Sequence, residues 1–404
     1  MNLVHLSLAD LRSRALNTTL NLTLLALGIA MIVVILLVTT QVEERLRRDA
    51  AGIDLVVGAK GSSTQLVLSA VYELDAPTAP IANSDVQRIS MDLAVRSAMP
   101  VALADNYYGY RIVGTTQQYL NHYGAVLAVG RLWQSKFEAV LGADVAARMR
   151  VGAGVTFTAA HGLRGGRDAV HEKPLYQIVG VLARTGTVLD RLVFTDVASV
   201  AEAHTPEFHP DPAGLVQEPP EDDRRTVTAL LLQCISTEAA AELAGRINAE
   251  TNLQAAVPAV EIGRLFGFIG IGREVLWGFA ILLMLTAGVS AFIALYDALT
   301  EHRHELAIMR VLGAGPRRLM ALLLLEGLAL AAAGAVAGLV LGHLFTSALG
   351  VALNRAGHLS VTGWTWHASE LWIVALALAV GLAAAFLPAW RARGIDIAET
   401  LARG

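Results

Sequence analysis

The chain has 404 residues, of which 54% are hydrophobic and only 16% are charged. It is too apolar for an ordinary soluble protein and too charged for one that lies wholly in a membrane, so we expect a few membrane spans and one large water-soluble part. The net charge of −4 argues against a general nucleic-acid binder, and the one cysteine, Cys234, excludes a disulfide within the chain.

The N-terminal part predicts a membrane span. Residues 1–19 form an amphipathic lead, with leucines beside Arg12 and Arg14, that suits a helix at a membrane interface. The apolar run 20–38 follows, and its length is close to what a hydrocarbon core of about 30 Å requires. A cleaved secretion signal is the alternative, but this run exceeds a typical signal core and no small-residue cleavage site follows it.

The segment 41–272 holds no run that could cross a membrane, and it is large enough to have its own core. It begins with a polar helix that continues the first span as a stalk. Strand-like runs lie at 53–72 (two runs, with a turn at Gly58–Ser62), 110–114, 154–159, 176–182, 191–195 and 228–235. Helical patterns lie at 84–97, 136–149, 197–203 and 238–250, and the Pro- and acid-rich segment 204–225 is typical of a loop. We expect an α+β domain in two lobes.

Three further apolar runs follow, at 275–295, 319–341 and 371–387. The predicted fold class is a membrane protein with four transmembrane α-helices and a large α+β extracytoplasmic domain inserted between helices 1 and 2. The expected segments are the lead (1–19), helix 1 (20–40), the α+β domain with its stalks (41–272), helix 2 (273–297), a loop with a short helix (298–317), helix 3 (318–342), a short polar interval (343–370), helix 4 (371–388, ending at Pro388) and a tail (389–404).

Small residues in the third run predict close helix packing. Gly334, Gly338 and Gly342 recur every four residues, a ridge that lets helix backbones approach in lipid. Chance in an Ala- and Gly-rich helix is the alternative, but the full repeat favours packing. Glu326 lies about two turns into this span, where burying a carboxylate is costly. We expect it to face another helix or the interface, with a structural role favoured over one in energy coupling.

A charged amphipathic stretch joins the second and third runs. Leu306 and Met309 belong to a short apolar stripe among charged residues, and Gly313, Gly315 and Pro316 end the helix. One interpretation is an ordinary solvated loop helix. The other is a coupling helix, through which a membrane protein responds to a cytosolic motor.

Positive residues near the span ends predict the topology. They are Arg12 and Arg14 before the first span, Arg303, Arg310, Arg317 and Arg318 between the second and third, and Arg391, Arg393 and Arg403 after the fourth, against Arg355 alone in the third-to-fourth interval. By the positive-inside rule both termini and the 296–318 loop lie in the cytosol, and the large domain lies outside. Arginines just after the first span argue the other way, but acidic neighbours accompany them.

Several motifs resemble the MacB/FtsX-type ABC permease family. They are ELAIMRVLGA (305–314) with Glu326-Gly327 after it, VGRLW (129–133), AVLGADVAARMRVGAGVTF (139–157), YQIVGVLARTGTVLDRLVF (176–194) and the closing pattern from Pro388 to Leu401. Ala153 departs from the family, in which an acidic residue is common. The resemblance implies that the 300–316 helix docks on a separate ATPase through Glu301, Glu305, Leu306, Met309, Arg310, Leu312, Gly313 and Ala314.

The resemblance also implies a function and partners. The chain would be the permease subunit of an ABC transporter in a bacterial inner membrane, with the large domain in the periplasm. It would form a homodimer with a second permease copy and bind a cytosolic ABC ATPase, which would hold ATP and Mg²⁺. The chain itself would be neither an enzyme nor the holder of a cofactor, and a periplasmic or lipoprotein partner is a further option.

Three classes of client stay open. The first is export or extraction of a lipoprotein, lipid, peptide or drug. The second is a non-transporting signalling module that regulates an envelope enzyme, and the third is a metal-linked envelope system. A receptor or adhesin would have no reason to carry a coupling helix.

Other chemistry is weakly indicated. The segment GAKGS (58–62) has the wrong spacing for a phosphate-binding loop, so ATP would be hydrolysed by another polypeptide. The outer histidines His161, His171, His204 and His209 lack cysteine partners and metal-site spacing, so solvated loop residues are favoured over a metal site.

Overall fold

The computed structural model describes residues 15–76, 78–161, 170–203, 227–301, 310–311, 315–355 and 361–392. The chain divides into two compact units. We call residues 1–42 with 268–404 the helix unit, and residues 43–267 the sheet domain.

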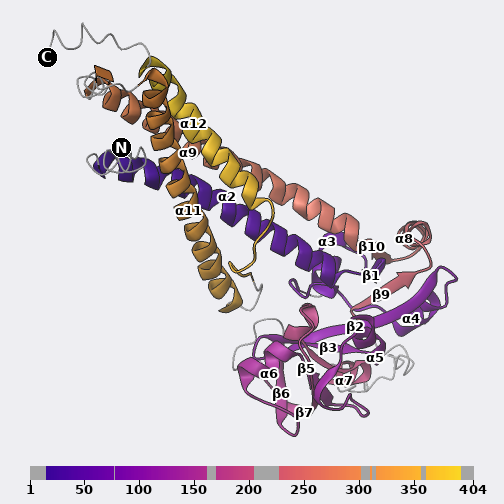
Figure 1. The fold of residues 1–404 in the computed structure, drawn as a ribbon. Helices are drawn as coiled ribbons and strands as arrows, with labels where there is room; N and C mark the ends of the chain where they lie inside the picture. Colours follow the sequence, from indigo (N-terminus) through magenta and orange to yellow (C-terminus); the bar gives the residue numbers. More distant parts are fainter. Residues whose placement is uncertain are drawn as a thin grey trace, which may run out of the picture. The chain divides into compact units, whose positions relative to one another are not determined.

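The elements run in chain order through both units (Figure 1). They are α2 (Ala15–Asp49), β1 (Leu55–Ala59), α3 (Ser63–Ala70), α4 (Asn83–Ser90), β2 (Val95–Tyr107), β3 (Tyr110–Thr115), α5 (Gln117–His122), β4 (Leu127–Gly130), β5 (Glu138–Leu141), α6 (Ala143–Met149), β6 (Thr156–His161), β7 (Val170–Leu182), the short 3₁₀ helix η2 (Val188–Arg191), β8 (Val193–Asp196), α7 (Val197–Ala203), β9 (Ala229–Cys234), α8 (Thr237–Glu250), β10 (Leu253–Ala256), α9 (Pro258–Glu301), α11 (Pro316–Arg355) and α12 (Glu370–Ala392).

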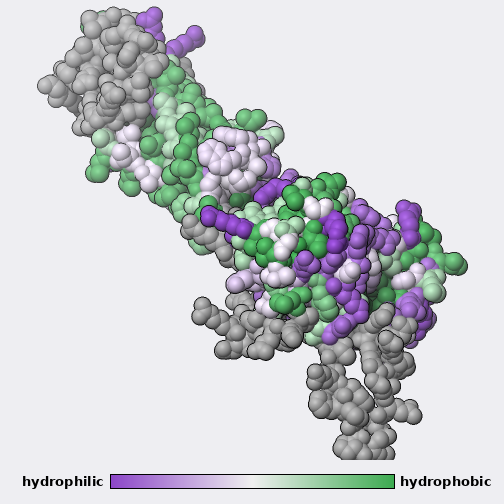
Figure 2. Space-filling view, turned by 90° about the horizontal axis from the view of Figure 1, so that it is seen from below, coloured by the Kyte–Doolittle hydropathy of each residue, from purple (hydrophilic) through white to green (hydrophobic). Residues whose placement is uncertain are grey.

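Four of the described helices are long and apolar enough to cross a membrane: α2, α9, α11 and α12. They share one core, to which α2 contributes Ile29 and Val33, α9 contributes Met284, α11 contributes Ala335 and α12 contributes Ala377. Figure 2 shows that hydrophobic residues dominate the described surface of the helix unit, whereas hydrophilic residues are spread over that of the sheet domain. This agrees with lipid around the first and water around the second.

The described strands of the sheet domain form one sheet in the order β10-β1-β9-β2-β3-β8-β5-β7-β4, and β6 pairs with β2 and β7. Most neighbours are antiparallel, but β3 with β8 and β5 with β7 are parallel. The sequence predicts two lobes; the structure has one continuous sheet with separate core clusters along it.

Both faces of the β1–β9 region are covered, which explains its unbroken apolar sequence. Val56 and Leu231 point into the core under α3 and α5, whereas Val57, Leu230 and Leu232 point into the core under α4 and α8. Strands buried on both faces have no polar alternation. Cys234 ends β9 in a buried position, as predicted, and burial raises the pKa of its thiol to about 11.

Three predictions of secondary structure in this domain are wrong, in whole or in part. The second strand-like run of 53–72 is the helix α3, because Ser62 caps its N-terminus by accepting a hydrogen bond from the backbone N–H of Gln65 at 3.3 Å. The first part of the 136–149 helix is the strand β5, because pairing with β7 and β8 on both sides buries it. The end of the 84–97 helix likewise belongs to β2, which begins at Val95.

The helices of the helix unit extend past the predicted spans. Helix α11 continues beyond residue 342 to Arg355, so the first half of the predicted polar interval is helical. Helix α12 continues through Pro388 to Ala392. Proline removes one backbone hydrogen bond there, but Ala389 is fully buried beside Leu299 of α9 and Leu319 of α11, and this packing holds the last turn.

Candidate functional site

The glycine ridge of α11, defined as Gly334, Gly338 and Gly342, faces α2. A β-carbon at Gly334 would lie 2.6 Å from Leu25 Cδ2, and one at Gly338 would lie 2.6 Å from the β-carbon of Ile29. One at Gly342 would lie 2.7 Å from the β-carbon of Val33. Real β-carbons do not approach other β-carbons this closely, so the packing of α2 on α11 requires glycine at 338 and 342, whereas at 334 the end of the Leu25 side chain would have to move.

A second close contact joins α11 to α12. A β-carbon at Gly327 would lie 2.6 Å from the β-carbon of Ala385 and 3.0 Å from the carbonyl oxygen of Gly381. The sequence reasoning above does not include Gly381, although Gly381 and Ala385 form a small-xxx-small pair that could have revealed it. Glu326, in the same turn as Gly327, is buried with 5% of its surface exposed. Helix α11 therefore packs against two partners through glycines on two sides.

A small cavity lies where all four helices meet. Its volume is about 20 Å³, and its walls include Asn21 of α2, Gly288 of α9, Leu330 of α11 and Val380 of α12. The walls are almost entirely apolar. Asn21 is 3% exposed, and its Oδ1 has no hydrogen-bond partner among the described residues.

The predicted ATPase-contact residues are only partly described. Glu301 is the last residue of α9, and Arg310 lies in a helical turn. Glu305, Leu306, Met309, Leu312, Gly313 and Ala314 lie outside the described residues. Pro316 is the first residue of α11, where a proline is tolerated because its missing N–H would have no helical partner.

Side chains from distant parts of the sheet domain cap the C-terminal end of α2. The Tyr72 hydroxyl donates to the Leu46 carbonyl at 3.2 Å, and the Tyr123 hydroxyl donates to the Asp49 carbonyl at 2.5 Å. The Nε2 of His122 lies 2.9 Å from the Ala51 carbonyl oxygen. The Asp49 carbonyl is the last of the helix and has no helical partner, so the Tyr123 hydroxyl satisfies it. The Leu46 carbonyl already accepts the backbone N–H of Ala50 at 3.1 Å, so the Tyr72 hydroxyl is its second donor. Burial raises the pKa of both tyrosines.

The carboxylate of Asp49 makes a fourth contact between the end of α2 and the sheet domain. Asp49 is 1% exposed, and its Oδ1 accepts a hydrogen bond from the backbone N–H of Val188 at 2.8 Å. Val188 begins η2 and belongs to the same core cluster as α3 and α5, so the end of α2 is also connected to the segment just before β8.

The N-terminal end of α9 is held in the same core. Ile262 is 7% exposed and belongs to the core cluster that Leu46 and Ala50 of the α2 end pack against. Glu261 is 3% exposed and accepts hydrogen bonds from the Thr64 hydroxyl at 2.7 Å and from Arg264 Nη1 at 2.8 Å. Both helices that enter the sheet domain thus end in one hydrophobic core beside α3.

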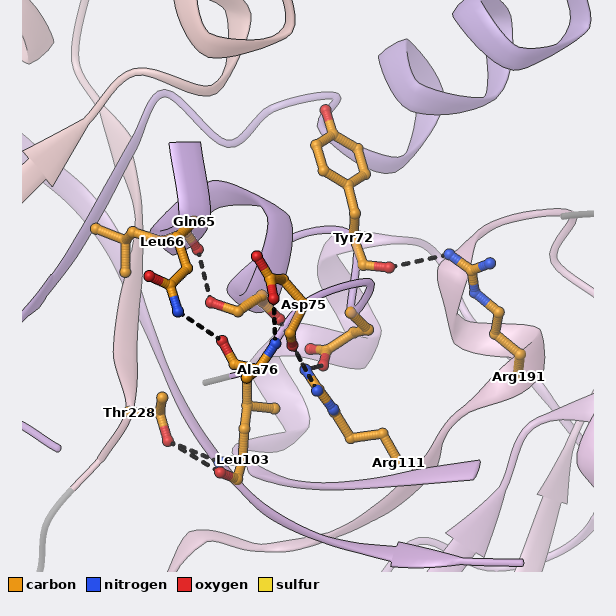
Figure 3. A network of polar contacts seen from close by, with 11 residues as sticks. Gln65, Leu66, Tyr72, Asp75, Ala76, Leu103, Arg111, Arg191 and Thr228 are labelled. Carbon is orange, nitrogen blue, oxygen red and sulfur yellow. Dashed lines mark hydrogen bonds and ion pairs between the residues drawn. The ribbon is translucent and has the colours of Figure 1, made fainter. Parts of the chain in front are cut away.

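A buried charge cluster underlies these contacts at the C-terminal end of α3 (Figure 3). Arg111 of β3 pairs with Glu73 at 2.8 Å, and the two side chains are 5% and 2% exposed. Arg111 also donates to the carbonyls of Ser69 at 3.2 Å and Asp75 at 2.6 Å. Arg191 Nη2 donates to the Tyr72 carbonyl at 3.0 Å. Tyr72 therefore connects the charge cluster to α2: its backbone carbonyl contacts Arg191 of the cluster, and its hydroxyl contacts Leu46 of α2.

Glu73 sits in an unfavourable setting. Its φ of 57° is in the left-handed region, which L-residues rarely adopt. Burial raises the pKa of its carboxyl to about 7, against the opposing effect of Arg111. One carboxyl oxygen, Oε1, has no hydrogen-bond partner among the described residues.

His161 lies in β6 and His171 in β7, while His204 and His209 lie outside the described residues. Across the part of the chain that the structure describes, no group of three or more potential metal-ligating side chains occurs.

Two family models match this chain, each over a different range of residues. The model of the FtsX-like permease C-terminal family matches residues 277–397, and that of the MacB-like periplasmic core domain matches residues 18–250. An uncharacterised ABC transporter permease of Methanocaldococcus jannaschii is 25% identical over 124 residues. That match covers 31% of this chain and 31% of the relative, so less than a third of each protein is compared.

Two solved structures are also similar. The periplasmic region of MacB from Actinobacillus actinomycetemcomitans shares 12% identity at a TM-score of 0.35, over 54% of this chain and 95% of that one. The extracellular domain of the ABC-type transporter YknZ from Gram-positive bacteria shares 12% identity at a TM-score of 0.30, over 50% and 98%. TM-scores this low carry no argument about function. The two family models cover most of the chain, and the chain belongs to the MacB/FtsX-type family of ABC transporter permeases.

Proposed function

We propose that this permease couples ATP hydrolysis by a separate cytosolic ATPase to movement of its sheet domain. The movement would export or extract a lipoprotein, lipid, peptide or drug without passing it through the four helices. ATP and Mg²⁺ would be bound by the ATPase, and this chain would contribute no cofactor site. The residues proposed to contact the ATPase are those of the 301–314 segment.

One observation carries the proposal: α2 and α9 are both fixed at their sheet-domain ends in a single core. The end of α2 is held by Tyr72, Tyr123 and Asp49, and the start of α9 by Ile262 and Glu261. Flexible tethers would not need such contacts. Helices with capped and buried ends can pass a displacement to the domain, because bending or unwinding them would expose buried polar groups.

The topology and assembly are part of the proposal. The arginine distribution supports cytosolic termini, a cytosolic 298–317 loop and a periplasmic sheet domain in a bacterial inner membrane. A second permease copy would complete a homodimer, and two ATPase subunits would bind it. A periplasmic or lipoprotein partner remains a proposal without a described surface.

The test is a pull-down of the tagged chain from its native membranes in mild detergent, followed by mass spectrometry. We expect a co-purifying ABC ATPase, which is lost or uncoupled in the charge reversals Glu305→Lys and Arg310→Glu. The matched control is Arg88→Glu, which reverses an exposed charge in the sheet domain. Recovery of the chain without an ATPase, or equal loss in the control, would contradict the proposal.

The client class is tested separately. In reconstituted membranes with the ATPase, transport-competent chains should release or move a lipid or lipoprotein only when ATP is hydrolysed. ATP-dependent activation of a captured envelope enzyme, with no substrate moved, would instead support the signalling alternative.

A further inference from the structure

His343 and Glu370 form a buried pair at one end of the helix unit. His343 lies in α11 and Glu370 is the first residue of α12. The Nε2 of His343 lies 3.1 Å from Glu370 Oε2, and the two side chains are 13% and 5% exposed. The Nδ1 of His343 lies 2.6 Å from the carbonyl oxygen of Gly363.

The geometry determines how many protons the pair must hold. A carbonyl oxygen can only accept, so Nδ1 must carry a hydrogen to bond Gly363. An ionised carboxylate can also only accept, so either Nε2 carries a second hydrogen or Glu370 is protonated and donates to Nε2. In both cases the pair holds one proton more than a neutral histidine beside a carboxylate.

We propose that His343 and Glu370 are a proton-binding site, and that the bound proton fastens the segment 361–370 to the helices around it. When the pair loses this proton, a neutral histidine lies beside a carboxylate. One ring nitrogen of His343 then points a lone pair at an acceptor, either the Gly363 carbonyl oxygen or the Glu370 carboxylate. One of the two contacts of His343 then breaks, because two acceptors cannot share a hydrogen bond.

The segment 361–370 is positioned to respond to that loss. Thr362 makes two hydrogen bonds with Gln41 of α2. The backbone N–H of Thr362 donates to Gln41 Oε1 at 2.9 Å, and Gln41 Nε2 donates to the Thr362 carbonyl oxygen at 2.8 Å. Gly363 packs so closely on the His343 backbone that no β-carbon would fit. The segment 361–370 therefore connects α2, α11 and α12. His343 of α11 contacts this segment at both Gly363 and Glu370.

Among the described residues, the other hydrogen-bond and ring-contact partners of the pair do not supply a competing charge. Glu370 Oε1 accepts the backbone N–H of His367 at 3.1 Å, and the ring of Trp366 lies with its centroid 4.5 Å from that of His343. Gln41 of α2, which hydrogen-bonds to this segment, is uncharged. His367 is the second titratable side chain nearby, and its Nδ1 has no partner among the described residues. It must therefore be separated from His343 by experiment.

The test is hydrogen–deuterium exchange of the full-length chain in lipid nanodiscs, with rates corrected for the intrinsic effect of pH. The reporting amides include Thr362, Trp364 and Glu370, each of which donates a hydrogen bond in this segment. Between about pH 5 and about pH 9 we expect their corrected exchange to rise by about 10- to 100-fold, the loss of one charge-assisted hydrogen bond.

Three variants assign the effect. Glu370→Gln lets an amide N–H donate to the neutral Nε2, so protection should stay at the low-pH level throughout. His343→Leu should lose protection at all pH values, and His367→Gln should behave as the wild type. A wild-type chain with no pH effect, a pH effect that persists in Glu370→Gln, or its disappearance in His367→Gln would each overturn the proposal. None of these measurements involves the ATPase, so they stand apart from the coupling proposal.

Discussion

Replacing Arg111 with Met tests the buried charge cluster of the sheet domain. The change preserves most of the side-chain volume but removes the donor to the Ser69 and Asp75 carbonyls and the partner of Glu73. Hydrogen bonds to charged groups contribute about 1.5–3 kcal/mol, and breaking a buried ion pair on one side costs about 3–5 kcal/mol. Against a total of about 5–15 kcal/mol for a domain, the loss is large.

The cost of Arg111→Met should depend on pH, and the sign follows from Glu73. In the wild type, burial raises the pKa of Glu73 from 4.5 in its ordinary state to about 7. The folded state therefore binds a proton at Glu73 more tightly than the unfolded state does. The stabilisation by this proton, on the order of 3 kcal/mol, is fully present below pH 4.5 and is lost as pH rises to about 7. Arg111 opposes this shift, so removing it raises the pKa of Glu73 further, and the variant goes on losing stability above pH 7.

The expected destabilisation by Arg111→Met is therefore about 2 kcal/mol near pH 5, where Glu73 is neutral in both proteins, and about 3–5 kcal/mol near pH 8. The assay is urea unfolding of the full-length chain in detergent, in a background whose other five tryptophans are replaced by phenylalanine. The fluorescence then reports Trp133, a core residue of the sheet domain that is 3% exposed. Glu73→Gln in the same background is the control, since it keeps the shape and removes the titration. An equal cost at both pH values would refute the reasoning.

Three further predictions concern the helices. Gly338→Leu should destabilise the helix unit by about 1–3 kcal/mol or more through the clash with Ile29, measured as a lower thermal midpoint in detergent, while Ala333→Leu on an exposed side of α11 should leave it unchanged. Tyr123→Phe should cost about 1 kcal/mol and speed amide exchange near residues 46–51, because the Asp49 carbonyl loses its cap; unchanged exchange there would contradict this role. Asn21→Leu should be neutral or stabilising in the same thermal assay, since it removes an unpaired buried oxygen from an apolar cavity, and a marked loss would show that Asn21 has a partner that this state of the protein lacks.

The sequence predicts the large features of this fold because they depend on long uniform patterns. Four apolar runs predict the four candidate spans, and the polar 41–272 segment predicts the α+β domain between the first two. The four-residue glycine repeat predicts close helix packing, and in the structure α2 lies against it. The partner helix itself could not be named from the repeat, since a ridge of small residues fits any helix.

The errors arise where short apolar runs carry little information. The run before Tyr72 has the composition of a strand, yet Ser62 and Gln65 form the start of a helix-capping pattern that was available in the sequence. For β5 no local signal existed, because Ala139–Leu141 becomes a strand only through pairing with β7 and β8. The Glu73–Arg111 and His343–Glu370 pairs join residues 38 and 27 positions apart, so only the folded chain shows them.

Helix α2 is held by two kinds of contact that respond to different conditions. Its membrane half packs on the glycine ridge without polar groups, so that contact depends on van der Waals fit and on the surrounding lipid rather than on the hydrophobic effect. Its other end is held by hydroxyl and carboxylate hydrogen bonds beside a cluster that includes Glu73, whose pKa is about 7. A change of lipid or detergent should therefore loosen the first contact and leave the second intact, whereas a change of pH should act at the sheet-domain end through Glu73 and at Gln41 through the 361–370 segment, and not at the glycine ridge. The coupling that we propose would require both contacts at once, which makes the two perturbations separable tests of it.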